Sequence, residues 1–151
     1  MKLKHVKGNL LNLAESGQFD IIVHGCNCFC IMGAGIAKQI ANRYPGACRV
    51  DQNTVSADIL KLGNWSEYYT GSFSIINAYT QFGFKNDIQS DVFEYSAFEL
   101  ILRKLAYMYP DERFGLPYIG MGLSGGDASR ILPMIEEFGR KVDVSLVEYT
   151  N

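Results

Sequence analysis

The sequence lacks the features that mark membrane, secreted and disordered proteins. No apolar run approaches the roughly 18 residues needed to span a bilayer. The first residues, MKLKHVKGNLLNL, contain no uninterrupted apolar stretch of the kind a signal peptide needs. Proline is scarce, with four residues, and no tract is dominated by polar residues or by proline and glycine. We therefore expect a cytoplasmic protein without a membrane partner, ordered along nearly its whole length.

An excess of charge of one sign is also absent. Fourteen lysines and arginines stand against 16 aspartates and glutamates, which gives a formal net charge of -2. Because an excess of cations is what attracts a polyanionic backbone, we expect no sequence-specific nucleic-acid partner. A small anionic ligand is compatible with this balance, since backbone N–H groups in glycine-rich loops bind phosphate without a surplus of basic side chains.

Cysteine is limited to Cys26, Cys28, Cys30 and Cys48. In the reducing cytoplasm we expect free thiols. Structural zinc sites usually pair cysteines that are separated by about two to four residues, whereas the first three cysteines here alternate and have no distant second pair. We therefore expect no metal. A zinc site that includes His24, and a redox-sensitive thiol, are the minor alternatives.

Strand-like and helix-like segments alternate along the chain. This order predicts a three-layer α/β/α fold with a mixed central sheet, built as one domain over residues 1–151. The segment GNWSEYYTG between two of the strands is predicted to be a long hairpin connection. The expected strands are 2–6, 19–24, 57–62, 73–79, 114–119 and 143–149, and the expected helices are 34–44, 92–108 and 127–138.

Two glycine-rich loops each join an expected strand to an expected helix. The first, HGCNCFCIMGAG, spans residues 24–35, and the second, IGMGLSGG, spans residues 119–126. Small residues let a ligand approach the backbone, and the first N–H groups of a helix attract anions. In an open α/β sheet both loops would face one crevice at the carboxyl ends of the strands, where a diphosphate fits between them.

Neither of the common nucleotide-binding fingerprints is present. The chain has no GxxxxGK[ST] motif, and GAGIAK is not a GxGxxG followed by an acidic residue at the required distance. A P-loop and an ordinary dinucleotide site are therefore disfavoured, and we expect no cofactor.

The stretch IIVHGCNCFCIMGAGIAKQIANRYP resembles the macrodomain signature of a strand, an asparagine, a glycine-rich triplet and a helix. More narrowly, HGCNC, GAGIA and ANRYP resemble the ADP-ribose 1″-phosphate phosphatase branch of that family. The segments KGNL, LPYIGMGLSG and VEY follow in the family's order, so the resemblance covers essentially the whole chain. It implies a domain that binds ADP-ribose or a derivative and hydrolyses ADP-ribose 1″-phosphate.

The resemblance also implies a set of ligand-binding residues. Asn9 matches a position near the adenine, often an aspartate in relatives, Asn27 matches the asparagine that contacts the distal ribose, and Tyr149 matches an aromatic near the ligand. Asp20 is included in the expected set. The two phosphate loops are matched by Gly33, Ala34, Gly35 and Ile36, and by Gly120, Met121, Gly122, Leu123 and Ser124.

His24 and Asn27 are the expected catalytic residues. An imidazole titrates near neutrality, so His24 is suited to acid or base catalysis, and a hydrogen-bonded histidine at a strand end is the alternative. Macrodomain hydrolases that remove ADP-ribose from modified macromolecules use a lysine in the middle strand and an aspartate in the second loop. Here the middle strand has Asn77 and its neighbours instead of lysine, and Ser124 stands at the aspartate position. Asp127 is available nearby, with a helix N-cap as its alternative role.

Several aromatic residues are candidates for a base-stacking wall. Phe82 and Phe84 flank a glycine at a strand end and are the better candidates for lining the pocket. Tyr79 is a further candidate, with core packing as the alternative for any of these aromatics, and Trp65 is expected to pack in a loop. Two further functions stay open from the sequence. One is a non-catalytic module that binds free or macromolecule-linked ADP-ribose, and the other is a structural protein that only keeps the fold.

Overall fold

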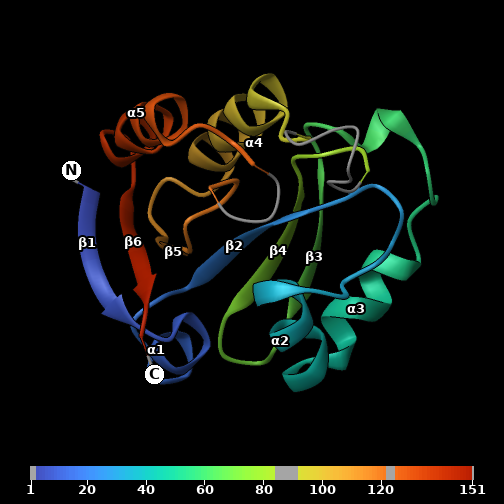
Figure 1. Ribbon diagram of the computed structural model, residues 1–151. Coiled ribbons are helices and arrows are strands. Elements are labelled where there is room, and N and C mark those ends of the chain that lie inside the picture. Colours follow the sequence, from blue (N-terminus) through green and yellow to red (C-terminus); the bar gives the residue numbers. More distant parts are fainter. Residues whose placement is uncertain (1–2, 84–91, 122–124, 151) are drawn as a thin grey trace.

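The computed structural model describes residues 3–83, 92–121 and 125–150. Six strands form one sheet in the order β1-β6-β5-β2-β4-β3, and every neighbouring pair is parallel except β3 with β4 (Figure 1). The predicted three-layer α/β fold with a mixed sheet is thereby confirmed. The strands are β1 Leu3–Gly8, β2 Ile21–Cys26, β3 Trp65–Tyr69, β4 Ser74–Tyr79, β5 Arg113–Leu116 and β6 Asp143–Tyr149.

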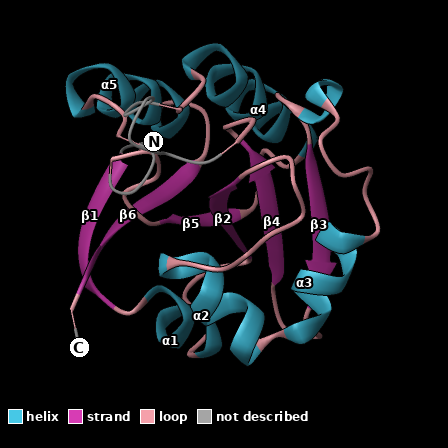
Figure 2. Cartoon of the chain, turned by 45° about the vertical axis from the view of Figure 1, so that its right-hand side comes forward, coloured by secondary structure: helices cyan, strands magenta, loops and turns pink. Residues whose placement is uncertain are grey.

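Helices cover both faces of the sheet. Figure 2 shows α4 and α5 on one side of the strands and α1, α2 and α3 on the other. Within the described residues, no helix has the length and apolar character required to cross a bilayer. The helices are α1 Leu10–Glu15, α2 Gly35–Arg43, α3 Pro45–Gln52, α4 Tyr95–Met108 and α5 Ala128–Gly139, and a short 3₁₀ turn, η1, spans Ile59–Lys61.

Alternation along the strands divides the interior into two apolar cores. On β2, Ile21 and Val23 pack with the core beneath α4 and α5, whereas Ile22 packs with the core beneath α1, α2 and α3. Successive side chains of a strand point to opposite faces, so a strand covered on both sides is apolar throughout. His24 follows the same alternation and therefore points toward the face that α3 covers.

The expected strand over residues 57–62 is wrong, and so is the hairpin drawn from it. Ala57 and Gly63 have φ values of 61° and 82°, which bend the chain at both ends, and the turn η1 lies between them. The antiparallel partner of β4 is β3, which begins at Trp65 inside the segment expected to be a connection. Trp65 packs against the core beneath α4 and α5, and Tyr68 packs against the core beneath α1, α2 and α3, so side chains of β3 contribute to both faces of the sheet.

The expected end of the first helix at Pro45 is confirmed, but the chain continues directly into α3. Proline has no N–H, and at the first position of a helix that group lacks a partner in any case, so Pro45 begins a helix as readily as it ends one. Asp127 is confirmed as the N-cap of α5, because its side chain accepts a hydrogen bond from the Ser129 N–H.

Gly115 on β5 is expected to tolerate no side chain. A Cβ atom there would lie 2.5 Å from a ring atom of Phe19, which is itself buried. Gly115→Ala should therefore lower the free energy of unfolding by about 1–3 kcal/mol, as overpacking does. Urea denaturation measures this, and Phe19→Leu in the same chain should restore part of the loss. Equal losses with and without the smaller side chain would show that the ring is not the cause.

Candidate functional site

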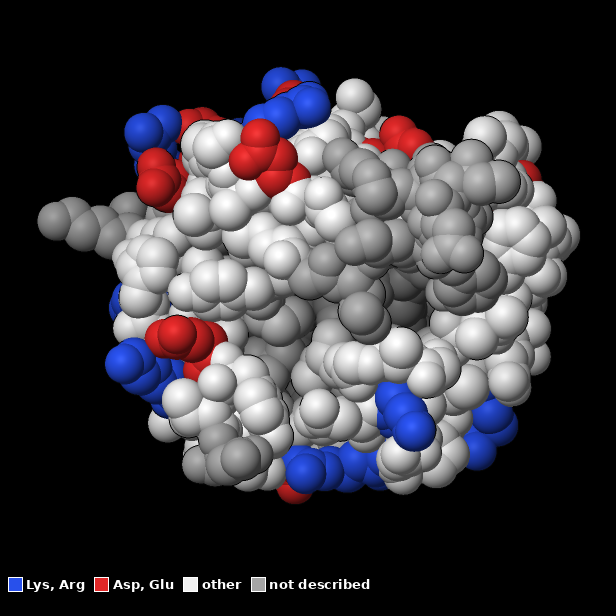
Figure 3. Space-filling model, in the orientation of Figure 1, with Lys and Arg blue, Asp and Glu red and all other residues white. Residues whose placement is uncertain are grey.

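The site predicted from the two loops lies at one edge of the sheet. Strands β2, β4 and β5 are parallel, so the segments that follow them leave the sheet at the same edge. The beginning of α2 and the segment after β5 both lie near the centre of the view in Figure 1. In the same orientation, the charged side chains drawn in Figure 3 lie mostly toward the margin of this face.

The first loop is organised by the side chain of Asn27, which is only 8% exposed. Its Nδ2 donates to the Ile31 carbonyl at 2.8 Å, and its Oδ1 accepts from the Phe29 N–H at 2.9 Å. Gly33, Ala34 and Gly35 then lie exposed where α2 begins. Alanine at the N-cap offers no side-chain acceptor, so the first N–H groups of α2 are open to an anion.

The second loop bends at Gly120, whose φ is 77° and whose carbonyl accepts from the Gly126 N–H at 2.6 Å. Any side chain at Gly120 would collide with the ring of Phe93, since its Cβ would lie 2.6 Å away. Met121 is half-buried at the start of the loop. The other expected ligand-binding residues of this loop, Gly122, Leu123 and Ser124, lie outside the described residues.

Asn9 and Tyr149 come together at the carboxyl ends of β1 and β6. Gly8 is the register partner of Tyr149, and the Tyr149 side chain is 57% exposed. Asn9 caps α1, because its Oδ1 accepts from the Asn12 N–H at 3.1 Å. These two residues lie at the same edge of the sheet as the loops, because β1, β6, β5 and β2 all run parallel.

Asp20 does not join this group. It precedes β2, at the amino edge of the sheet, and the six residues of the strand separate it from Asn27 by roughly 20 Å. Its carboxylate accepts three hydrogen bonds from Arg113, at 2.8, 3.0 and 2.9 Å. The Arg113 side chain lowers the pKa of Asp20. The expected place of Asp20 in the ligand set is corrected on this geometry, because an ion pair at the opposite edge occupies its side chain.

No protein-family model matches the chain. Its sequence is 30% identical, over 158 residues, to an uncharacterized 17.5 kDa protein of phage T4, covering 99% of this chain and 97% of that protein, so the two share a family. The macrodomain of Thermus aquaticus DarG matches the fold with a TM-score of 0.73 and 20% identity over 97% of both chains. This chain has the macrodomain fold. Thermosipho africanus DarTG, solved in complex with ADP-ribose, matches with a TM-score of 0.80 and 18% identity, over 99% of this chain and 42% of that one.

His24 of this macrodomain is fully buried beneath the site. Its Nε2 lies 2.6 Å from Asn77 Oδ1, and Asn77 in turn donates to the Ala47 carbonyl of α3 at 3.0 Å. Burial lowers the pKa of His24 to about 4, although the hydrogen bond with Asn77 acts in the opposite direction. The catalytic role of His24 stays a prediction. The geometry favours the alternative, in which His24 is an interior residue held by a hydrogen bond. Its partner is the side-chain amide of Asn77 and not the backbone.

The four cysteines of the macrodomain are free thiols. Burial raises the pKa of Cys26, and it raises the pKa of Cys28 to about 11, so both stay protonated at neutral pH. Cys26 Sγ lies 3.7 Å from each ring nitrogen of His24, whereas Cys28 Sγ donates to the Gln81 carbonyl. Among the described residues, no group of three or more His, Cys, Asp or Glu side chains is arranged to hold a metal ion.

The expected aromatic wall is found in part. Phe82 contacts Phe29 of the first loop edge to face, with ring centroids 5.0 Å apart, so it borders the macrodomain site. Tyr79 is 1% exposed and fills the interior. Trp65, expected to pack in a loop, begins strand β3 and packs against the core of α4 and α5 instead. Phe84 lies outside the described residues.

One buried residue beside the first loop was not foreseen. Lys61 is 8% exposed, and its Nζ donates to the carbonyl of Cys28 at 3.1 Å. The sequence analysis did not place it there, because ADILKL was interpreted as a strand. The contact exists only because η1 folds back against the loop.

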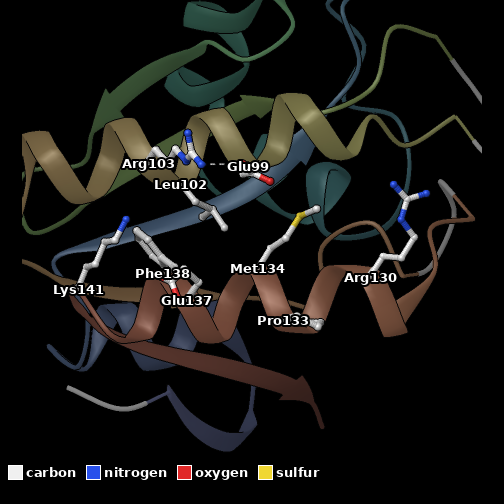
Figure 4. Close-up of a pocket in the computed structure, with 9 residues that line it drawn as sticks. All are labelled: Glu99, Leu102, Arg103, Arg130, Pro133, Met134, Glu137, Phe138 and Lys141. Carbon is white, nitrogen blue, oxygen red and sulfur yellow. Dashed lines mark ion pairs between the residues drawn. The ribbon is translucent and has the colours of Figure 1, made fainter.

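A second concavity of the macrodomain lies between α4 and α5, with a volume of about 510 Å³. Figure 4 shows Leu102, Met134 and Phe138 pointing into it and the ion pair of Arg103 with Glu99 on its rim. None of the residues that line it belongs to the two glycine-rich loops. The groove is therefore separate from the candidate site.

His24 should make the macrodomain unstable in mild acid. Its pKa is about 4 in the folded state against about 6.5 in the unfolded chain, so its contribution to stability is complete above pH 6.5 and is lost as the pH falls toward 4. Since each pKa unit corresponds to about 1.4 kcal/mol, the free energy of unfolding should fall by about 3 kcal/mol across this window. Urea denaturation from pH 7 to pH 4 measures it.

The matched variants are His24→Gln and His5→Gln, the second of which removes an exposed histidine of β1. The decrease should vanish in the first variant and persist in the second. An unchanged decrease in His24→Gln would assign the acid sensitivity to other groups.

Proposed function

We propose that this macrodomain, acting as one domain, binds ADP-ribose or a close derivative in the crevice between its two glycine-rich loops. The observation that carries the proposal is the beginning of α2, where three small exposed residues lead into a helix without a side-chain cap. The helix dipole and the unpaired N–H groups there attract a diphosphate. The similarity to DarTG solved with ADP-ribose gives additional support.

The remaining residues at this edge suit the two ends of such a ligand. Asn27 follows the carboxyl end of β2 directly, within the first loop, where it suits the distal ribose. Asn9 and Tyr149 stand together at the carboxyl ends of β1 and β6, which suits the adenine end. Because the Asn9 oxygen already caps α1, its amide N–H groups are the part that would donate to the base. An exposed tyrosine ring offers a stacking surface.

Gly35→Glu should abolish binding, because it places a bulky anion where the diphosphate would lie. The matched control is Gly71→Glu, which introduces the same residue at another exposed glycine with positive φ, in a turn between β3 and β4. Isothermal titration calorimetry with ADP-ribose should give heat of binding for the original chain and the control, and none for Gly35→Glu. Equal isotherms for both variants would refute the placement of the site, and no heat with the original chain would refute the function.

A second candidate function is the hydrolysis of ADP-ribose 1″-phosphate to ADP-ribose and phosphate. It is supported by the resemblance of HGCNC to the phosphatase branch and by the position of Asn27, whose amide lies in the loop where the distal ribose would sit. The removal of ADP-ribose from modified macromolecules has less support. The β4 position considered for a lysine holds Asn77. The carboxylate of Asp127 already accepts hydrogen bonds from the N–H and the hydroxyl of Ser129 as a helix cap.

Phosphate release from ADP-ribose 1″-phosphate separates these possibilities. We expect turnover by the original chain, a loss of about 100-fold in Asn27→Ala, typical of a polar group that stabilises a transition state, and a smaller loss in His24→Gln. Binding of ADP-ribose, measured on the same samples, controls for folding. Tight binding without release would identify a non-catalytic module, and a larger loss in His24→Gln than in Asn27→Ala would return the catalytic role to the histidine.

A further inference from the structure

Lys61 is the buried cation closest to the first loop. It ends the turn η1, and its Nζ lies 3.1 Å from the carbonyl oxygen of Cys28 and 3.5 Å from Cys30 Sγ. The ammonium group also stands over the ring of Tyr79, 4.5 Å from the centroid. A lysine is rarely this buried, because removal of its charge from water is costly unless partners compensate for it.

The compensating charge comes from the end of α3. Asp51 is 1% exposed, and its Oδ1 accepts from the Tyr79 hydroxyl at 2.7 Å, while its Oδ2 has no hydrogen-bond partner among the described residues. Burial raises the pKa of Asp51, and the attraction of Lys61 partly offsets that rise. The aromatic ring therefore lies between a carboxylate that contacts its hydroxyl and an ammonium that contacts its face. Each buried charge compensates for part of the desolvation cost of the other.

Every polar group of Cys28 is held by a neighbouring segment. Its N–H donates to the Phe82 carbonyl at 2.9 Å, and its thiol donates to the Gln81 carbonyl. Its carbonyl accepts from the Ala57 N–H at 2.8 Å as well as from Lys61. Cys28 is therefore held in one position within the loop, and it directly follows Asn27 in the chain.

We propose that Lys61 is a positioning residue: it holds the carbonyl of Cys28 and thereby keeps the first loop in the shape in which Asn27 and the start of α2 meet the ligand. The statement about the ligand rests on the proposed function, whereas the statement about the shape of the loop does not. A bond from a charged donor to a buried carbonyl is stronger than one between neutral groups, which suits a loop that must stay open to solvent on its ligand side. The contacts of the Lys61 ammonium group are with Cys28, Cys30 and Tyr79, which are not in the expected ligand set.

Lys61→Met should weaken the binding of ADP-ribose about 10-fold while the sheet stays folded, because the methionine keeps most of the buried stem and removes only the ammonium group. The matched control is Lys104→Met. Lys104 also donates to a backbone carbonyl, that of Gly63 at 2.8 Å, but it does so from α4, and neither residue belongs to the first loop. Calorimetry well below the melting temperature should show the loss in the first variant alone. Equal affinity in the two variants would overturn the link to the ligand.

Hydrogen exchange measured without any ligand tests the loop directly. The Phe29 N–H is bonded to Asn27 Oδ1, so its exchange rate reports whether the loop keeps its shape. In Lys61→Met this amide should exchange at least 10-fold faster, while the amides of Ile22 and Ile75 in the central strands keep their rates. In Lys104→Met all three should be unchanged. Unchanged exchange at Phe29 would overturn the proposal, and faster exchange at all three amides would reveal a general loss of stability instead.

The two readouts separate the two failures. If the original chain does not bind ADP-ribose but Phe29 exchanges faster in Lys61→Met, the proposed function fails and the positioning role stands. If the original chain binds ADP-ribose and Lys61→Met changes neither the affinity nor the exchange, the positioning role fails and the function stands.

Discussion

The parallel pairing of β2 with β4 on one side and β5 on the other is the constraint on which the candidate site depends. Parallel strands send the segments that follow them to the same edge, so loops that begin far apart in the chain, at residues 24 and 119, leave the sheet on the same side. The pairing holds because β2 is apolar on both faces and is covered by helices on both sides. The same pairing leaves Asp20 at the opposite edge, where its side chain forms an ion pair with Arg113.

The polar groups buried beneath the first loop form the second layer of this arrangement. His24, Asn77 and the Ala47 carbonyl join β2 to β4 and α3, and Tyr79 with Asp51 joins β4 to the end of α3. An unsatisfied polar group in such surroundings is costly, so each bond favours one arrangement of α3 against the sheet. The small residues of the first loop supply little packing of their own, so the loop depends on these buried hydrogen bonds for support.

Much of the fold could be predicted from local patterns, because those patterns have local causes. The β-branched run of β2, the apolar stripe of α4 and the cap at Asp127 each depend on neighbours within a few residues, and each was found within a few residues of its expected place. Residues 57–62 were misjudged because their composition favours a strand, whereas the left-handed backbone at Ala57 and Gly63 turns them away from the sheet. Nothing in the local sequence required an alanine to adopt that conformation.

The sequence by itself determined the α/β class, the two glycine-rich loops and the identity of the small residues at the start of α2. These follow from periodicity, from glycine chemistry and from a family resemblance that spans the chain. Only the tertiary structure decided that His24 is an interior group with a pKa of about 4, that Asp20 is remote, and that Lys61 lies under the loop. The physical reason is that burial and charge compensation depend on which distant segments pack together, and the sequence near a residue does not contain that information.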